Sequence, residues 1–372
     1  MKKCFIFAAV AVVATAACTK VETIDNSPET PIAFQVVNYQ TQTKAYNSLL
    51  DEYAAGTQVT SFTTNAWFHG AGSYGTQQFM ADESIVPDNA TTPTKWAPSS
   101  RDYYWPKTGY INFFSYAGSP APTAKAEGSL TYTNVDIVPA SNILVADAAY
   151  RFKENNDPAT YGTSGATKGV PTLFRHKLAK VKFDVILDAS ETQPAYAWTA
   201  TITDASITVP QKGTLALTVS EPSGTTPATA AYSGAWASLG TFNPIDKVSG
   251  NVVLKAKGEK KSDIDNIPDG STAGKAAELI ADSAVIPHTL TNDVVFNMTY
   301  TLAFSYNGGT EVKEDIVIPA TKLTDFAPSI AAWAMNTIYT YHIIIKPNGI
   351  ILFDPAVETW EPEADEPVKT YN

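Results

Sequence analysis

Four histidines are the side chains best suited to acid–base or metal chemistry in this sequence of 372 residues. No two of them lie four residues apart, and the His-Glu-x-x-His pattern of a metalloprotease is absent. The Gly-x-Ser-x-Gly turn that presents a serine nucleophile is absent as well. The sequence therefore predicts no catalytic site and no metal site, and we expect a protein that is not an enzyme. The four histidines are His69, His176, His288 and His342.

Two short motifs resemble ligand-binding loops. Residues 70–75 read Gly-Ala-Gly-Ser-Tyr-Gly, but a phosphate cradle needs a helix after the glycines, and residues 76–80 favour a strand. Residues 263–270 contain three aspartates, but Ile267 and Pro268 stand where a calcium loop needs a ligand and a glycine. A hairpin tip and a solvated acidic turn are the favoured interpretations, so no cofactor is expected.

Aromatic side chains are concentrated between residues 96 and 116. Aromatic residues on alternating strands usually form core, although an exposed set could stack on a glycan. The core interpretation is favoured here. The cluster consists of Trp96, Tyr103, Tyr104, Trp105, Tyr110, Phe113, Phe114 and Tyr116.

One modification motif occurs near the middle of the C-terminal half. Asp282-Ser283-Ala284 fits a short acidic–hydroxyl–apolar pattern for O-glycosylation, which makes Ser283 a possible acceptor. Three residues often match such a pattern by chance.

The N-terminus has the features of an export signal. Lys2 and Lys3 precede an apolar run, residues 5–17, that is too short to span a membrane and ends in small residues before Cys18. We expect cleavage after residue 17 and lipidation of Cys18, the alternative being an ordinary secretory peptide with an incidental cysteine. Cys4, the only other cysteine, leaves with residues 1–17, so no disulfide is expected. Several acyl carbons buried at about 0.8 kcal/mol per CH₂ would anchor the chain firmly in a membrane.

Composition excludes nucleic acid as a partner. The formal net charge is −11, whereas a phosphate-binding surface needs clustered cations. The length is enough for about two domains of roughly 100–200 residues.

Period-2 alternation recurs along the chain and predicts an all-β fold. After a polar tether at 18–31, residues 32–39 alternate, with Ile32, Phe34 and Val36 on one face. Later alternating runs include 180–187 and 296–306, and the second leads through Asn-Gly-Gly into a hairpin. Only two segments, 273–282 and 328–333, suggest a short helix or turn. Short strands with dense turn signals favour Greek-key β-sandwiches.

We expect two such sandwich domains, divided near residues 191–195. The predicted organisation is a signal peptide at 1–17, a tether at 18–31, a first strand and loop at 32–45, and domains at 46–192 and 193–372.

Several segments together resemble the fimbrillin family of the Bacteroidales. They lie in the same order along the chain and cover nearly all of it after residue 17. They are the aromatic run 96–117, the segment Phe-Arg-His-Lys-Leu-Ala-Lys-Val-Lys-Phe at 174–183, Trp333 with the segment Asn-Thr-Ile-Tyr-Thr-Tyr at 336–341, and the pattern of Ile350, Phe353, Val357 and Trp360.

The resemblance implies two tandem transthyretin-like β-sandwich domains and assembly into type V pili with other fimbrial subunits, identical or different. It implies an outer-membrane lipoprotein on the cell surface, with a contribution to adhesion to host or bacterial surface ligands. In the family, a protease cuts the loop after the first strand, and a strand of the next subunit fills the space that is left.

On this sequence, the resemblance assigns Ile32, Phe34 and Val36 to the removable strand and the cut to the bond between Lys44 and Ala45. The alternative is that Lys44 is an ordinary loop residue. The donor strand would be residues 350–360. Whether the subunit belongs to the stalk, the tip or the anchor stays open. A different function, a surface glycan-binding lipoprotein, would use exposed tryptophans such as Trp96 or Trp236.

Overall fold

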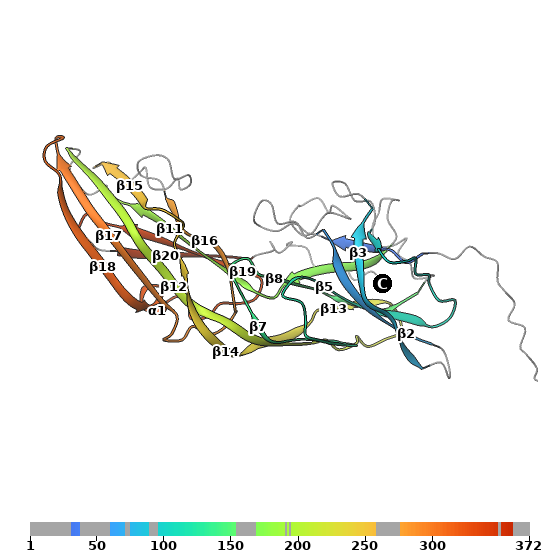
Figure 1. Cartoon of the computed structure of the whole chain (residues 1–372). Helices are drawn as coiled ribbons and strands as arrows, with labels where there is room; N and C mark the ends of the chain where they lie inside the picture. Colours follow the sequence, from blue (N-terminus) through green and yellow to red (C-terminus); the bar gives the residue numbers. More distant parts are fainter. Residues whose placement is uncertain are drawn as a thin grey trace, which may run out of the picture.

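The computed structural model describes residues 31–37, 60–70, 75–88, 96–153, 169–189, 192, 195–257, 276–348 and 351–359. The described chain is almost entirely β-structure, as predicted, and its sheets follow one another along an elongated molecule (Figure 1). Cys18, Lys44, Ala45 and the acidic turn at 263–270 lie outside the described residues.

A nine-stranded sheet forms one end of the molecule. Its order is β13-β9-β5-β2-β3-β4-β1-β10-β8, and β5 also pairs with β8, so the strands from β5 round to β8 close into a ring. Apolar side chains from β1, β2, β5 and β10 meet inside this ring and form the first core. The strands are β1 (Phe34–Val37), β2 (Phe62–His69), β3 (Thr76–Pro87), β4 (Trp96–Pro98), β5 (Tyr110–Ser119), β8 (Asn142–Ala146), β9 (Ala148–Phe152), β10 (Val170–His176) and β13 (Ala228–Ala230).

A seven-stranded sheet runs along the molecule, organised by one strand of 23 residues, β12. The first half of β12 pairs with β15 and β17, and its second half pairs with β7. The strands are β6 (Ala124–Ala126), β7 (Ser129–Asp136), β12 (Tyr196–Thr218), β14 (Ser233–Asp246), β15 (Val252–Lys257), β17 (Val295–Tyr306) and β18 (Val312–Lys322).

A four-stranded sheet packs on the first half of β12 and completes a β-sandwich. Its order is β16-β11-β19-β20, and its apolar face meets that of β12 and β17 in the second core. Phe183 stacks there between Phe296 and Tyr341. The strands are β11 (Ala179–Leu187), β16 (Ala277–Val285), β19 (Thr337–Ile345) and β20 (Ile351–Thr359).

A third core joins the two ends of the molecule. Successive residues of β5 point to opposite sides, so Phe113 packs inside the ring while Phe114 packs against β7 and β12. Trp236 of β14 contributes to this junction and donates its indole N–H to the carbonyl of Lys177, 2.8 Å away. The cores are therefore contiguous through β5 and β12.

One sequence prediction needs correction. Residues 277–285 form a strand rather than part of a helix, because they pair with β11 along most of their length. The only helix of the described residues is the single turn α1 (Leu323–Phe326). The alternating run at 180–187 was placed in the N-terminal domain, whereas the partners of this strand, β16 and β19, are C-terminal. The division into two domains stays a prediction.

The predicted hairpin after residue 306 is confirmed. Asn307 and Gly308 have positive φ angles of 48° and 72°, as a tight hairpin turn requires, and β17 pairs with β18 across it. Within the described parts of the chain, no helix is long and apolar enough to cross a bilayer.

Candidate functional site: the β1 site

The first strand, β1, is inserted between two strands that come from distant parts of the sequence. It pairs in parallel with β10, Phe34 opposite Val170, and in antiparallel fashion with β4, Phe34 opposite Trp96. The amide of Ile32 donates to the carbonyl of Tyr103 over 2.7 Å, and the amide of Val170 donates to the carbonyl of Ala33 over 2.8 Å. We call this position, lined by β4, β10 and Tyr103, the β1 site.

The alternating face of β1 points into the first core. Ile32, Phe34 and Val36 are each at most 1% exposed. The ring of Phe34 meets the rings of Phe62 and Phe113 edge to face, with centroids 5.6 Å and 5.5 Å away. At about 1.5–3 kcal/mol per buried side chain, these three residues contribute roughly 5–9 kcal/mol of apolar burial. Removing β1 would therefore expose an apolar surface as well as unpaired backbone on both sides.

A glycine allows β1 to lie this close to the segment before β10. A Cβ on Gly169 would lie 2.8 Å from the carbonyl carbon of Phe34 and 3.0 Å from the amide nitrogen of Gln35. Both atoms are backbone, so they cannot move aside as a flexible side chain would. Gly169 is thus required by a close approach of two backbones.

A buried carboxylate supports the opposite wall of the β1 site. Glu83 of β3 is 7% exposed and accepts hydrogen bonds from the amide and hydroxyl of Ser100 and, over 3.2 Å, from the hydroxyl of Tyr103. These bonds hold the segment 99–104 against β3. The carbonyl of Tyr103 is thereby fixed where it accepts from Ile32.

Of the other predicted site residues, only Ser283 lies among the described residues. Cys18, Lys44 and Ala45 lie outside the described residues. Ser283 lies in β16, is 3% exposed and donates its hydroxyl to the carbonyl of Ala281 over 2.8 Å. A glycan acceptor needs an accessible hydroxyl, so the folded chain disfavours the O-glycosylation predicted at Ser283.

The aromatic residues proposed as glycan platforms are buried. Trp96 is fully buried in the first core, and Trp236 is 8% exposed in the junction. A sugar could stack on neither, so these two tryptophans cannot serve as the platforms of the alternative function, and the favoured interpretation of Trp96 as a core residue is confirmed. The glycine-rich motif at 70–75 joins β2 to β3, with His69 opposite Thr76, and a strand rather than a helix follows it.

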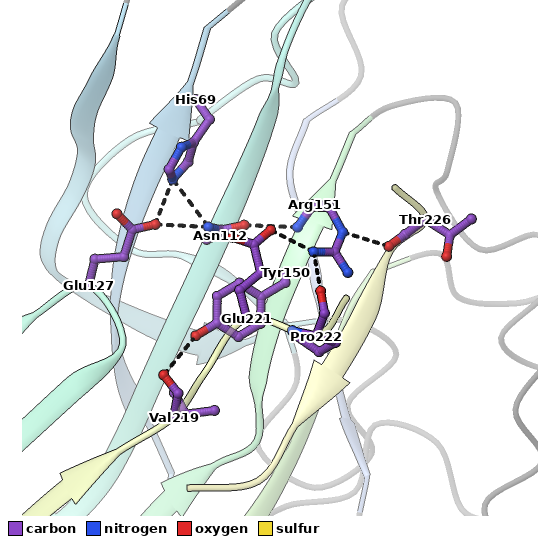
Figure 2. A network of polar contacts seen from close by, with 9 residues as sticks. All are labelled: His69, Asn112, Glu127, Tyr150, Arg151, Val219, Glu221, Pro222 and Thr226. Carbon is purple, nitrogen blue, oxygen red and sulfur yellow. Dashed lines mark hydrogen bonds and ion pairs between the residues drawn. The ribbon is translucent and has the colours of Figure 1, made fainter. Parts of the chain in front are cut away.

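A polar network that the sequence did not indicate lies on the outer side of the ring. Figure 2 shows Asn112 of β5 at its centre, between the carboxylate of Glu127 and the backbone amide of Arg151. Glu127 also contacts His69, with 2.6 Å between Oε1 and Nε2. The residues come from four separate segments, so no local spacing could have revealed them. Among the described residues, no three His, Cys, Asp or Glu side chains form a metal-binding group.

Comparison with family models gives a match over most of the chain. A family model described as fimbrillin-like matches residues 43–360. The chain belongs to the fimbrillin-like family. The resemblance found in the sequence is thereby confirmed, and the match begins after β1. As a member of this family, the chain is a structural, non-enzymatic fimbrial subunit of a cell-surface appendage, and it associates with other fimbrial subunits.

Solved structures of low identity were also found. A fimbrial protein from Bacteroides vulgatus is 14% identical, with a TM-score of 0.45, and the alignment covers 89% of this chain and 100% of that one. A tip fimbrial protein from Porphyromonas gingivalis with a C-terminal truncation is 11% identical, with a TM-score of 0.38, over 90% of this chain and 100% of that one. No curated protein matches the sequence.

Proposed function

We propose that this fimbrial subunit is exported as an outer-membrane lipoprotein through Cys18 and assembles by proteolysis-triggered strand exchange at the β1 site. Cutting between Lys44 and Ala45 separates β1 from the rest of the chain, and a strand of another subunit then takes its place. The observation that carries the proposal is the position of β1, a short N-terminal strand that is fully inserted in a core built by other segments.

The energetics of the β1 site suit an exchange that is slow until the chain is cut. While β1 is covalently attached, its apolar side chains compete for the site at a very high effective concentration. Once the chain is cut, β1 can leave, and the exposed core and backbone edges favour any strand with the same alternation. A strand that buries three large apolar side chains would then dissociate very slowly.

The donor in this scheme is the last described strand. β20 lies at the edge of the four-stranded sheet, where β19 is its only partner among the described strands. An edge strand can leave a sheet with the loss of one ladder, whereas a central strand would lose two. Residues 350–360 are thus the proposed donor segment, and the assembled fimbria contributes to adhesion at the cell surface.

The cut is tested by replacing its lysine in cells that assemble the fimbria. Lys44→Ala should prevent cleavage. The subunit extracted from membranes with detergent should then be monomeric and still carry its lipid. Lys313→Ala, at a lysine that is 62% exposed on β18, is the matched control and should polymerise as the wild type does. Unchanged polymerisation of the Lys44→Ala chain would show that processing at this bond is not required.

A further inference from the structure

The nine-stranded sheet has a second edge at which a strand can be added. β9 pairs with β5 on one side and with β13, a strand of three residues, on the other, where β13 is its only partner among the described strands. Ala228, Thr229 and Ala230 lie opposite Tyr150, Ala149 and Ala148. All five residues of β9 are buried, so the loss of β13 would uncover apolar surface and unpaired backbone together.

Three residues of pairing are too few to hold a strand by themselves, because an isolated short ladder is marginally stable in water. Two side chains of β9 hold the segment before β13: the hydroxyl of Tyr150 donates to the carbonyl of Val219 over 3.4 Å, and Arg151 makes three further contacts. Arg151 donates from Nε to the carbonyl of Thr226 over 2.8 Å, and from Nη1 to the carboxylate of Glu221 over 2.6 Å and the carbonyl of Pro222 over 2.7 Å. Figure 2 shows the three acceptors arranged around the guanidinium group, with the oxygen of Thr226 on one side of it, that of Glu221 on the other and that of Pro222 below. We call this arrangement the Arg151 clamp.

The backbone at Arg151 is specially shaped for this role. Its φ angle is +63°, in the left-handed region that costs a non-glycine residue about 1–2 kcal/mol, and the pairing of β9 with β5 shifts register beside it. The side chain of Asn112, which is fully buried, stabilises this conformation by accepting a hydrogen bond from the Arg151 amide over 2.8 Å. Asn112 in turn donates to Glu127 over 2.8 Å. The strained turn therefore aims the guanidinium at the segment before β13.

We infer that the Arg151 clamp holds β13 on β9 and thereby closes a second strand-accepting edge of the subunit. The partner that this edge fits is an extended segment with small side chains, because Ala228 and Ala230 occupy it within the same chain. With the edge closed in this way, strand addition by another molecule is restricted to other sites. The inference does not depend on cleavage at Lys44, since β13 covers β9 in the intact chain.

The test uses the intact chain, residues 19–372, and compares Arg151→Met and Glu221→Gln with a matched control. Lys125→Met is the control. Lys125 of β6 donates to Asp82 of β3 over 2.8 Å, so this change also removes an ion pair between two segments, but one that lies away from β13. Hydrogen–deuterium exchange of the peptide that covers residues 226–232 measures how firmly β13 is held. Light scattering measures whether the chain associates.

We expect the amides of β13 to exchange at least about tenfold faster in both clamp variants, as the loss of a charge-assisted hydrogen bond implies, and no faster in Lys125→Met. The clamp variants should also form concentration-dependent oligomers, which a synthetic peptide of residues 226–232 suppresses. Unchanged exchange at β13 would overturn the clamp, and faster exchange in chains that stay monomeric would overturn the strand-accepting edge. If Arg151→Met does not fold, Glu221→Gln, which removes only the negative charge opposite the guanidinium group, decides by the same readings.

Discussion

The ring of Phe34 meets the ring of Phe113 edge to face, with centroids 5.5 Å apart and ring planes at 88°. The two residues belong to β1 and to β5, the strand that joins the first core to the junction. This contact makes the first strand an integral part of a core that the rest of the chain builds. We therefore expect changes at Phe34 to affect the stability of the whole subunit.

Truncating Phe34 should destabilise the uncut chain strongly. Phe34→Ala removes a fully buried ring and leaves a cavity between Phe62 and Phe113, so we expect the free energy of unfolding to fall by about 3–5 kcal/mol. Urea denaturation followed by tryptophan fluorescence measures the loss. Val317→Ala, at a valine that is 67% exposed, is the control and should change the free energy by no more than about 0.5 kcal/mol. Equal effects of the two changes would contradict the burial of β1 in solution.

Adding one carbon atom at Gly169 should loosen β1 selectively. The new Cβ of Gly169→Ala would lie 2.8 Å from the carbonyl carbon of Phe34, so β1 must shift, at a cost of about 1–3 kcal/mol. Faster hydrogen exchange of the amides in residues 32–37 would report the shift. Gly240→Ala is the matched control, because nothing lies within 4 Å of its Cβ. A Gly169→Ala chain with unchanged exchange in β1 would show that the two backbones are farther apart in solution.

Stability should decrease as the pH falls below about 6.5, because of a histidine on β10, the strand that holds β1. Burial, with Lys180 and Lys177 nearby, lowers the pKa of His176 well below its ordinary value of 6.5. The folded chain thus keeps His176 neutral while the unfolded chain binds a proton there. Each such proton lowers the free energy of unfolding by up to about 1.4 kcal/mol per pH unit as the pH falls. Burial lowers the pKa of His288 as well, and its effect has the same sign.

Urea unfolding between pH 7.5 and 5 measures this decline, and His176→Gln should make it shallower. Above pH 7.5 both chains should show the same dependence on pH, because His176 is neutral in the folded and unfolded states there. If the two chains lost stability in parallel down to pH 5, His176 would not be the group responsible.

Local alternation was enough to predict several strands but not their partners. The run predicted at 296–306 is β17 within one residue, and the run at 180–187 is β11 within one residue. Alternation does not tell which strand lies beside which, and the parallel pairing of β1 with β10 joins residues as distant in sequence as Phe34 and Val170. For the same reason β11 could not be assigned to its C-terminal partners from sequence.

The residues of the candidate site were predictable where they depended on burial and not where they depended on tertiary contacts. Ile32, Phe34 and Val36 share one face of a strand, and that face is buried. The close approach at Gly169 and the Arg151 clamp appear only once strands from distant segments are adjacent. A three-residue motif likewise carries no information about burial, which is why Ser283 matched a modification pattern although it lies in a sheet.

The most direct test of the proposed strand exchange is to lock β1 in its site reversibly. Pro31 and Tyr104 face each other in an isolated antiparallel bridge at the start of β1, and Tyr104 is 40% exposed. Opposite residues in such a pair have Cα atoms about 4.5–5.5 Å apart, within the range for a disulfide. The double variant Pro31→Cys/Tyr104→Cys in residues 19–372 contains no other cysteine.

After cleavage at Lys44, the oxidised double variant should stay monomeric on a denaturant-free gel. Dithiothreitol, which reduces the disulfide, should start its polymerisation. The single variant Tyr104→Cys should polymerise without the reductant. Polymers formed by the oxidised, cleaved double variant would mean that subunits join while β1 is still in place, and strand exchange at the β1 site would be refuted.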